Sequence, residues 1–421
     1  MIIKNRLQFF LLLLFVFTFF SCGKKDEEIT LKAKLIHDRI LTVDTHSDTP
    51  LLMIDSTWDI GVRHETEKVR DSKIDLPRME EGGLDVEFFA AYVGQRERTP
   101  EKYKWAKARA VELISVIKVM CEKYGNIISL GIKPGDAYKN HRAGLLTAYI
   151  GMENGFPIGM DLENVKYYFD QGVRYITLCH YTNNDICDSS TDPDGPEHHG
   201  LSDFGRQIVK EMNRLGMIID VSHISDESFY DVLEVSKAPV IASHSCTRAL
   251  CDHPRNMSDK MIQALAAKGG VIQMCFFTGY VKKERPNRKR EAALDELEGK
   301  YGPWNEIEDS EIKEEYRKKR WAIMKKYPRR KTTVKKLVDH IDHVIKLVGV
   351  DYVGIGTDFD GGGGLIGCND ISEMVNVTKE LVRKGYSEED IEKIWGGNFM
   401  RVFREVVKIS EQDRIPNESI H

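Results

Sequence analysis

The chain has 421 residues, 41% hydrophobic and 30% charged, so it can bury a sizeable core like an ordinary globular enzyme. Its formal net charge of -5 gives no attraction to nucleic acid, so a small-molecule substrate is the better expectation. The cysteines include no Cys-x-x-Cys pair, which argues against a thiolate metal site or a redox motif.

The N-terminus differs in composition from the rest of the chain. Lys4 and Arg6 precede an apolar run over residues 11–20, which small residues then follow. This order of charged, apolar and small residues is typical of a secretory signal peptide, which we predict over residues 1–22. The apolar run is too short to span a membrane comfortably.

Cys22 directly follows Phe-Phe-Ser, as in a bacterial lipoprotein box. Cleavage there would leave Cys22 as the lipidated first residue; the alternative is a plain signal peptide or an uncleaved anchor. We therefore expect an exported protein, anchored by acyl chains to a bacterial membrane and facing the periplasm or the exterior. Residues 23–35 would form the tether, with charged and flexible residues at 24–28.

Eight short apolar runs, each ending in a polar or small residue, recur along the rest of the chain. They cover residues 40–46, 85–92, 145–153, 175–180, 216–223, 239–244, 270–276 and 352–358. Helix-like segments lie in most of the gaps, at residues 102–124, 162–171, 204–215, 226–235, 260–267 and 334–347. This alternation predicts an α/β fold, an eight-stranded TIM-like β/α barrel over residues 36–408, rather than an open doubly wound sheet.

Residues 282–330, after the seventh strand, form a long charged insertion outside this repeat. Its helical stretches lie at residues 290–300 and 311–325, and their charges alternate in sign at helical spacing. The pattern favours a solvated helical hairpin, and a lid or a dimer contact is the alternative.

The C-terminal region begins with a helix start signal. Ser387 and Asp390 resemble a capping box, so we predict a helix from there past Gly396. Residues 409–421 are predicted to be a polar tail, frayed after Ser410.

Six of the eight strand runs end on a titratable residue: His46, Glu153, His180, His223, His244 and Asp358. The carboxyl ends of the strands of a barrel meet at one face, where barrel enzymes build their active sites. Any one of these histidines could be a satisfied core residue. Six such ends in register argue against a purely structural role.

The residue types at these ends suit divalent metal ions. His46 and Asp48 lie two residues apart on one face of the first strand, so an imidazole and a carboxylate can address one ion. Glu153 has two carboxylate oxygens, one for each of two ions, and His223 and His244 can complete the second site. This set suits two Zn²⁺ ions with positions open for water. The softness of the ligand atoms does not exclude Mn²⁺ or Co²⁺.

Two such ions bridged by hydroxide would lower the pKa of that water and polarise a carbonyl group. The reaction also needs a group that moves a proton to the leaving amine. Asp358 is the candidate, because it ends the last strand between glycines that allow close backbone approach.

Eight motifs, in order along the chain, resemble the membrane (renal) dipeptidase family of binuclear zinc metallopeptidases. They are Asp44-Thr-His-Ser-Asp48, Gly172-Val-Arg-Tyr-Ile-Thr-Leu-Cys-His180, Ile219-Asp-Val-Ser-His223, Ala238-Pro-Val-Ile-Ala-Ser-His-Ser245, Asp252-His-Pro-Arg-Asn256, Asp339-His-Ile-Asp-His343, Gly354-Ile-Gly-Thr-Asp-Phe-Asp-Gly361 and Gly397-Asn-Phe-Met-Arg-Val-Phe403. The resemblance extends from Ile36 to Val406. It implies a barrel of the metal-dependent hydrolase type that cleaves dipeptides, often accepting a D-residue at the second position.

The resemblance also implies roles for single residues. One zinc ion would be bound by His46, Asp48 and Glu153, and the other by Glu153, His223 and His244. His180 would contact the substrate carbonyl and steady the oxyanion, and Asp358 would transfer the proton. Arg255 and Tyr280 would hold the terminal carboxylate of the dipeptide, which an arginine fork can bind with two hydrogen bonds.

Two departures from the family pattern concern substrate preference rather than the reaction. The first motif has Thr45 and Ser47 where Gly and Asn are commoner, and Glu87 stands where many members have Gln, adding a possible negative charge near the mouth. Hydrolysis of another small amide or a lactone is the alternative activity. A degenerate barrel that only binds a partner is a third hypothesis, which the complete ligand set argues against. A homodimer is implied by the resemblance alone.

Overall fold

The computed structural model describes residues 25–64, 72–304, 307 and 309–414. Within them, one parallel sheet contains the strands β1 (Val43–Ser47), β2 (Val86–Tyr92), β3 (Ile128–Leu130), β4 (Leu146–Glu153), β5 (Val173–Thr177), β6 (Ile218–Asp220), β7 (Ile241–Ser245), β8 (Val271–Met274) and β9 (Val353–Ile355). The strands follow chain order from β1 to β9, except that β3 lies off this path beside β4.

Backbone hydrogen bonds between β1 and the segment after β9 close the sheet. Ser47 forms a parallel bridge with Phe359. The amide of Asp48 donates to the carbonyl of Phe359 at 2.9 Å, and the amide of Asp358 donates to the carbonyl of His46 at 3.0 Å. The predicted TIM-like barrel of eight parallel strands is therefore confirmed, and its seam lies among the residues predicted to form the site.

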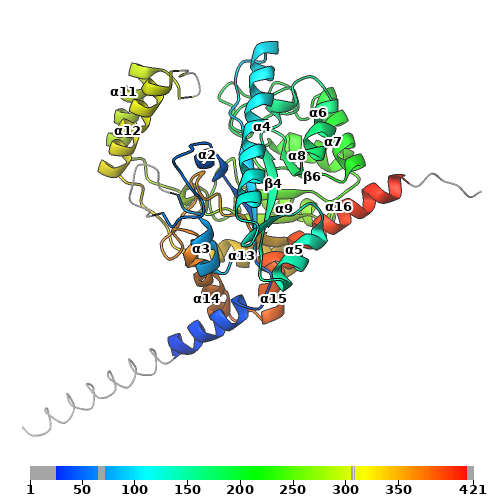
Figure 1. Cartoon of the computed structure of the whole chain (residues 1–421), viewed down its shortest axis with the longest axis vertical. Helices are drawn as coiled ribbons and strands as arrows, with labels where there is room; N and C mark the ends of the chain where they lie inside the picture. Colours follow the sequence, from blue (N-terminus) through cyan, green and yellow to red (C-terminus); the bar gives the residue numbers. More distant parts are fainter. Residues whose placement is uncertain (1–24, 65–71, 305–306, 308, 415–421) are drawn as a thin grey trace, which may run out of the picture.

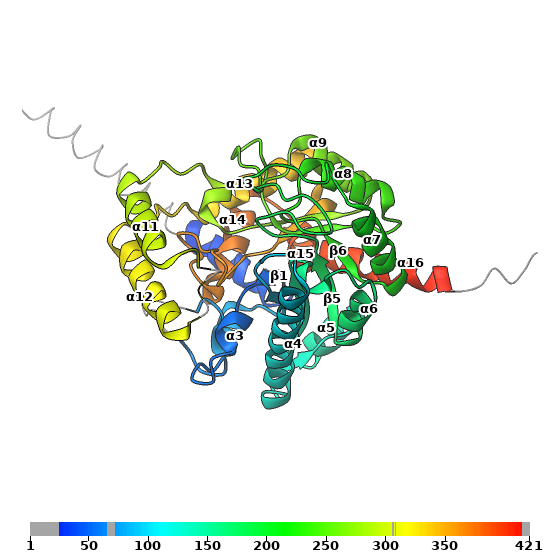
Figure 2. The ribbon, with the colours of Figure 1, turned by 90° about the horizontal axis from the view of Figure 1, so that it is seen from above.

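Helices connect the strands and surround the barrel (Figures 1 and 2). They are α2 (Pro50–Met53), α3 (Leu76–Gly82), α4 (Pro100–Lys123), α5 (Pro134–Arg142), α6 (Glu163–Asp170), α7 (Asp203–Leu215), α8 (Asp226–Val235), α9 (Asp259–Ala267), α10 (Thr278–Val281), α11 (Arg288–Tyr301), α12 (Ser310–Lys326), α13 (Val334–Val348), α14 (Val375–Lys384), α15 (Glu388–Glu392) and α16 (Asn398–Arg414). Short turns η1 (Phe156–Ile158), η2 (Val350–Tyr352), η3 (Ile371–Glu373) and the π-helical η4 (Lys393–Gly397) complete the chain. Hydroxyl caps such as Ser202, Ser225 and Ser258 explain why α7, α8 and α9 begin where predicted.

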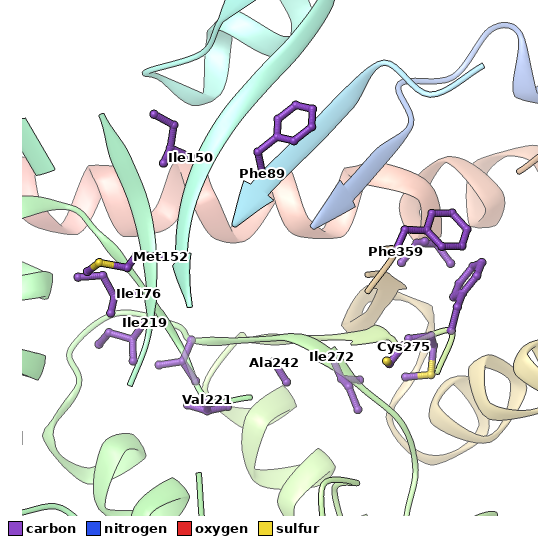
Figure 3. Packing of buried hydrophobic residues seen from close by; sticks show 14 of the residues in the cluster. Phe89, Ile150, Met152, Ile176, Ile219, Val221, Ala242, Ile272, Cys275 and Phe359 are labelled. Carbon is purple, nitrogen blue, oxygen red and sulfur yellow. The ribbon is translucent and has the colours of Figure 1, made fainter. Parts of the chain in front are cut away.

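Side chains alternate along the strands between two buried surfaces. One set, which includes Phe89, Ile150 and Ile272, belongs to the large core shared with the surrounding helices (Figure 3). The other set lies in the first halves of the strands and packs against α16, where the rings of Phe88 and Phe399 meet edge to face at 4.9 Å. The helix α16 therefore closes the amino-terminal end of the barrel, and the carboxyl ends of the strands are left for the site.

Two expectations about the chain ends are wrong for the described residues. Residues 25–37 form a helix instead of a flexible segment, because Ala33 and Ile36 are buried and Asp26 pairs with Lys379 and Arg383. At the other end α16 continues to Arg414 instead of fraying after Ser410. The predicted signal peptide, Cys22 and the last part of the polar tail lie outside the described residues.

The charged insertion forms the predicted helical hairpin of α11 and α12, at the edge of the molecule in both views (Figures 1 and 2). Leu297, Ile307 and Tyr316 form a small core of its own, separate from the core of the barrel. Its role as a lid or a dimer contact stays a prediction. Within the described part of the chain, no helix combines the length and the apolar character needed to cross a bilayer.

Candidate metal centre

The side chains at the carboxyl ends of the strands converge on one place. Three overlapping groups bring possible ligand atoms within 4.8 Å of one another: His46, Glu153 and His244; Glu153, His180 and His223; and His46, Asp48 and Asp358. These groups contain all five residues predicted to bind metal, together with the two predicted to act on the substrate.

Glu153 lies at the centre of this cluster. Its Oε1 is 3.1 Å from the Nε2 of His223, 3.4 Å from the Nε2 of His244 and 3.6 Å from the Nε2 of His180. Its Oε2 is 3.5 Å from the Nε2 of His46. The two carboxylate oxygens therefore face different imidazoles, which is the geometry that a shared ligand needs.

Several polar atoms of the cluster fit a cation. The Nε2 of His46 and the Oδ1 of Asp48 are buried without a hydrogen-bond partner in the described part of the chain. The Nε2 atoms of His223 and His244 are only 2.9 Å apart, a distance at which a proton or a cation must offset the repulsion of their lone pairs. Imidazole nitrogens with carboxylate oxygens form the donor set that zinc and similar divalent ions prefer.

Two of the histidines are oriented through their other ring nitrogen. The Nδ1 of His46 lies 2.8 Å from the hydroxyl of Tyr175, and the Nδ1 of His244 lies 2.8 Å from the Oγ of Ser243. Such partners hold a ligand ring in place and decide which nitrogen is free to bind.

The cluster gathers several carboxyl groups close together. Burial and the neighbouring Glu153 carboxylate raise the pKa of Asp48 well above its usual range, and burial raises the pKa of Asp358 to about 7. Burial opposes charge on His46, but the carboxylates around it, Glu153 first, raise its pKa to about 10. Bound cations would neutralise this excess of carboxylates.

The residues predicted to hold the substrate lie beside the cluster. Arg255 is 3% exposed; its Nη2 donates to the carbonyl of His244 at 3.0 Å, and its Nε has no partner among the described residues. No carboxylate of the described chain forms an ion pair with this guanidinium, and the ring of Tyr280 lies 5.2 Å from it. An unpaired buried cation can receive an anionic group of a ligand.

His180 belongs to the cluster and feels the charge of this guanidinium. Burial lowers its pKa to about 4, so the imidazole is neutral at physiological pH. Its Nδ1 lies 3.4 Å from the hydroxyl of Tyr92. Sequence reasoning missed Tyr92, although Tyr92 ends β2 in register with Glu153 on β4.

The position of Glu87 corrects one expectation. Glu87 lies opposite Asp44 between β2 and β1 and is fully buried near the start of β2, not near the mouth at the carboxyl ends of the strands. Burial, and after it the charge of Asp44, raise the pKa of Glu87 well above its usual range, so its surroundings disfavour a charge on this carboxyl group.

The chain shares this architecture with known peptidases. The family model for membrane dipeptidases (peptidase family M19) matches residues 31–417. Dipeptidase tcpJ of Claviceps purpurea (strain 20.1) is 31% identical over 378 residues, which cover 88% of this chain and 78% of that protein. The crystal structure of the probable dipeptidase PvdM from Pseudomonas aeruginosa is 32% identical with a TM-score of 0.77, over 91% of this chain and 99% of that one.

A metallopeptidase from Rhodobacter sphaeroides, solved with a phosphinate mimic of the dipeptide L-Ala-D-Ala, has the same fold. Its TM-score is 0.70 at 21% identity, over 87% of this chain and 99% of that chain. The match to the family model over nearly the whole chain and the named dipeptidases agree with the metal-compatible cluster at the strand ends. The chain therefore belongs to the membrane dipeptidase family, peptidase family M19, and is a metallo-dipeptidase.

Proposed function

We propose that this protein uses two zinc ions to hydrolyse dipeptides that carry a free C-terminal carboxylate, including dipeptides with a D-residue at the second position. The observation that carries the proposal is the buried guanidinium of Arg255 beside the metal-compatible cluster, with no carboxylate of the described chain paired to it. A clamp for the terminal carboxylate beside the cluster would require a free carboxylate on the residue that follows the cleaved bond.

The cluster supports two ions that share one ligand. His46, Asp48 and Glu153 would hold one ion, and Glu153, His223 and His244 the other. When bound, such ions would supply hydroxide near neutral pH and would polarise the peptide carbonyl. The remaining work belongs to side chains of the chain itself.

His180 would stabilise the carbonyl oxygen of the substrate. Its Nδ1 faces the hydroxyl of Tyr92, and when that hydroxyl donates, the proton of the neutral imidazole lies on Nε2. The Nε2–H can then donate to the developing oxyanion, a contact that strengthens in the transition state.

Asp358 would carry the proton to the leaving amine. Its carboxyl belongs to the same group of side chains as His46 and Asp48, which supports this role. Arg255 and Tyr280 would fix the terminal carboxylate and so present the bond to these groups.

Hydrolysis of three substrates tests the proposal: L-Ala-L-Ala, L-Ala-D-Ala and L-Ala-L-Ala amidated at its C-terminus. We expect the purified full-length protein in detergent to cleave both free dipeptides but not the amide. Hydrolysis should stop after chelation of the metal and should return when zinc is added. Cleavage of the amide at the same rate would refute the carboxylate clamp. Failure on all three with zinc bound would favour the alternative substrate, another small amide or a lactone.

We also propose that the protein is exported and anchored to a bacterial membrane through acyl chains on Cys22. The support is the sequence alone, in which charged, apolar and small residues precede Cys22. The Cys22→Ala protein should incorporate no labelled palmitate and should leave the acyl-anchored membrane fraction. Equal labelling of both proteins would refute the anchor.

A further inference from the structure

The carboxylate of Asp220, at the end of β6, joins three neighbouring strands under the metal centre. It is fully buried, and its Oδ1 accepts hydrogen bonds from the amides of Ser222 at 3.0 Å and Ser243 at 2.8 Å. Its Oδ2 accepts from the hydroxyls of Thr177 at 2.5 Å and Ser243 at 2.6 Å. Asp220 is not one of the residues predicted to bind metal or substrate.

The hydrogen bond from Ser243 to Asp220 determines which ring nitrogen of His244 carries the proton. A serine hydroxyl has one proton, and here that proton is donated to the carboxylate. The Oγ of Ser243 is then an acceptor towards the Nδ1 of His244, 2.8 Å away, so this nitrogen must carry the ring proton. The Nε2 of His244, which faces Glu153, keeps a free lone pair.

We propose that Asp220 and Ser243 are positioning residues that hold His244 in the tautomer able to bind a divalent cation. Neither residue belongs to the cluster of candidate ligand atoms, so both act through His244. The inference rests on the metal centre of the proposed function and is independent of which dipeptide is cleaved. Partners of this kind change metal affinity by about tenfold to a hundredfold.

An isosteric change at Asp220 should invert this hydrogen-bond chain. In Asp220→Asn the amide oxygen must face the two backbone amides, whose protons cannot be moved, so the NH₂ group must face the hydroxyl of Ser243. Ser243 then accepts from Asn and donates to the Nδ1 of His244 at 2.8 Å, which is closer than its other neighbour, the Oγ of Ser222 at 3.3 Å. This places the ring proton on Nε2 and blocks metal binding there.

The experiment measures the zinc dissociation constant of the full-length protein by chelator competition, after removal of all metal. One zinc ion is proposed to bind Glu153, His223 and His244. We expect Ser243→Ala to weaken the binding of this ion about tenfold and Asp220→Asn to weaken it about a hundredfold. The double variant should recover to the level of Ser243→Ala, because no hydroxyl is left to place the proton on Nε2. Thr177→Val is the matched control: it removes a donor to the same Oδ2 without touching His244, and should stay near the wild type.

A purely structural role predicts the opposite pattern for the double variant, which would then be at least as weak as Asp220→Asn. Equal affinities of Ser243→Ala and Thr177→Val would overturn the proposal, even if Asp220→Asn fails to fold. A wild-type protein that binds no zinc would overturn the metal centre and this inference together. If the wild-type protein binds zinc but cleaves no dipeptide, only the proposed substrate is refuted. The zinc affinities of the variants then still decide whether Asp220 and Ser243 position His244.

Discussion

Gly361 brings the backbone unusually close to two carboxylates of the metal centre. A methyl group at this position would clash with Oδ1 of Asp358 and Oδ2 of Asp48. The glycine therefore allows the backbone to approach both carboxylates closely, because they occupy the space that a side chain would need.

We expect Gly361→Ala to reduce kcat/KM for L-Ala-L-Ala by about a hundredfold or more, because displacement of about 1 Å in a catalytic group has effects of this size. The control is Gly135→Ala, where an added methyl meets nothing within 4 Å. A Gly361→Ala enzyme with wild-type kcat/KM would show that neither carboxylate position matters.

The guanidinium of Arg255 gives the second prediction at this scale. Lysine keeps the charge but loses the planar fork, so Arg255→Lys should raise KM for free dipeptides by about tenfold or more and change kcat less. Steady-state kinetics measure this, with Arg248→Lys as a control, because Arg248 lies nearby but pairs with Asp226. An unchanged KM would argue against the clamp.

The sequence predicted the residues that point into the site better than the residues that orient them. His46, Glu153 and His244 end apolar runs on a titratable group, which is a visible signal. Tyr175 and Asp220 orient ligands from within or beside strands, so their roles depend on pairing across the sheet. The sequence of one strand does not show which residues of the neighbouring strand lie beside it.

At the scale of elements, the helix over residues 25–37 is fixed to the barrel by a buried chain of hydrogen bonds. The Nε1–H of Trp395 donates to the Oγ1 of Thr378 at 2.8 Å, and this hydroxyl lies 2.8 Å from the Nδ1 of His37. The Nε2 of His37 is 2.9 Å from the carbonyl of Gly82, which can only accept. A neutral imidazole satisfies every partner in this chain.

This chain predicts a pH dependence of stability. Burial lowers the pKa of His37 in the folded protein, so the folded state binds fewer protons than the unfolded chain. The stabilisation is complete above about pH 6.5 and is lost as the pH falls, by at most about 1.4 kcal/mol per pH unit for one proton. We expect His37→Gln to have a lower Tm at about pH 8 but a smaller loss of Tm down to about pH 5 than the wild type. Parallel Tm curves would exclude His37 as a source of the acid sensitivity.

Two elements were not predicted from the sequence. One is short, and the other depends on contacts with residues far along the chain. The strand β3 (Ile128–Leu130) has three residues, too few for an apolar run, and it is held by pairing with β4. The helix over residues 25–37 is highly charged, so its composition favoured a flexible tether. Its order comes from partners such as Thr378, more than 300 residues away.

At the scale of the whole molecule, the closure of the barrel and the metal centre are parts of one structure. The amides of Asp48 and Asp358 donate the hydrogen bonds that join β1 to the last strand segment. Their side chains belong to the candidate metal centre together with Glu153; Asp48 and Glu153 are buried and Asp358 is partly buried. Without cations the ionised forms of these carboxyl groups would repel one another at the seam where the barrel closes, and the raised pKa values of Asp48 and Asp358 reflect this cost.

Removal of metal should therefore destabilise the barrel and open this seam first. A ligand at about a thousand times its Kd stabilises the folded state by about 4 kcal/mol, so we expect chelation to lower Tm by several degrees. Hydrogen exchange should become faster in peptides that contain Asp48 and Asp358, while peptides of α16 at the opposite end change little. The His223→Ala protein, which lacks a proposed ligand, should respond less to chelation. The same Tm and the same exchange with and without metal would show that the barrel closes independently of its metal centre.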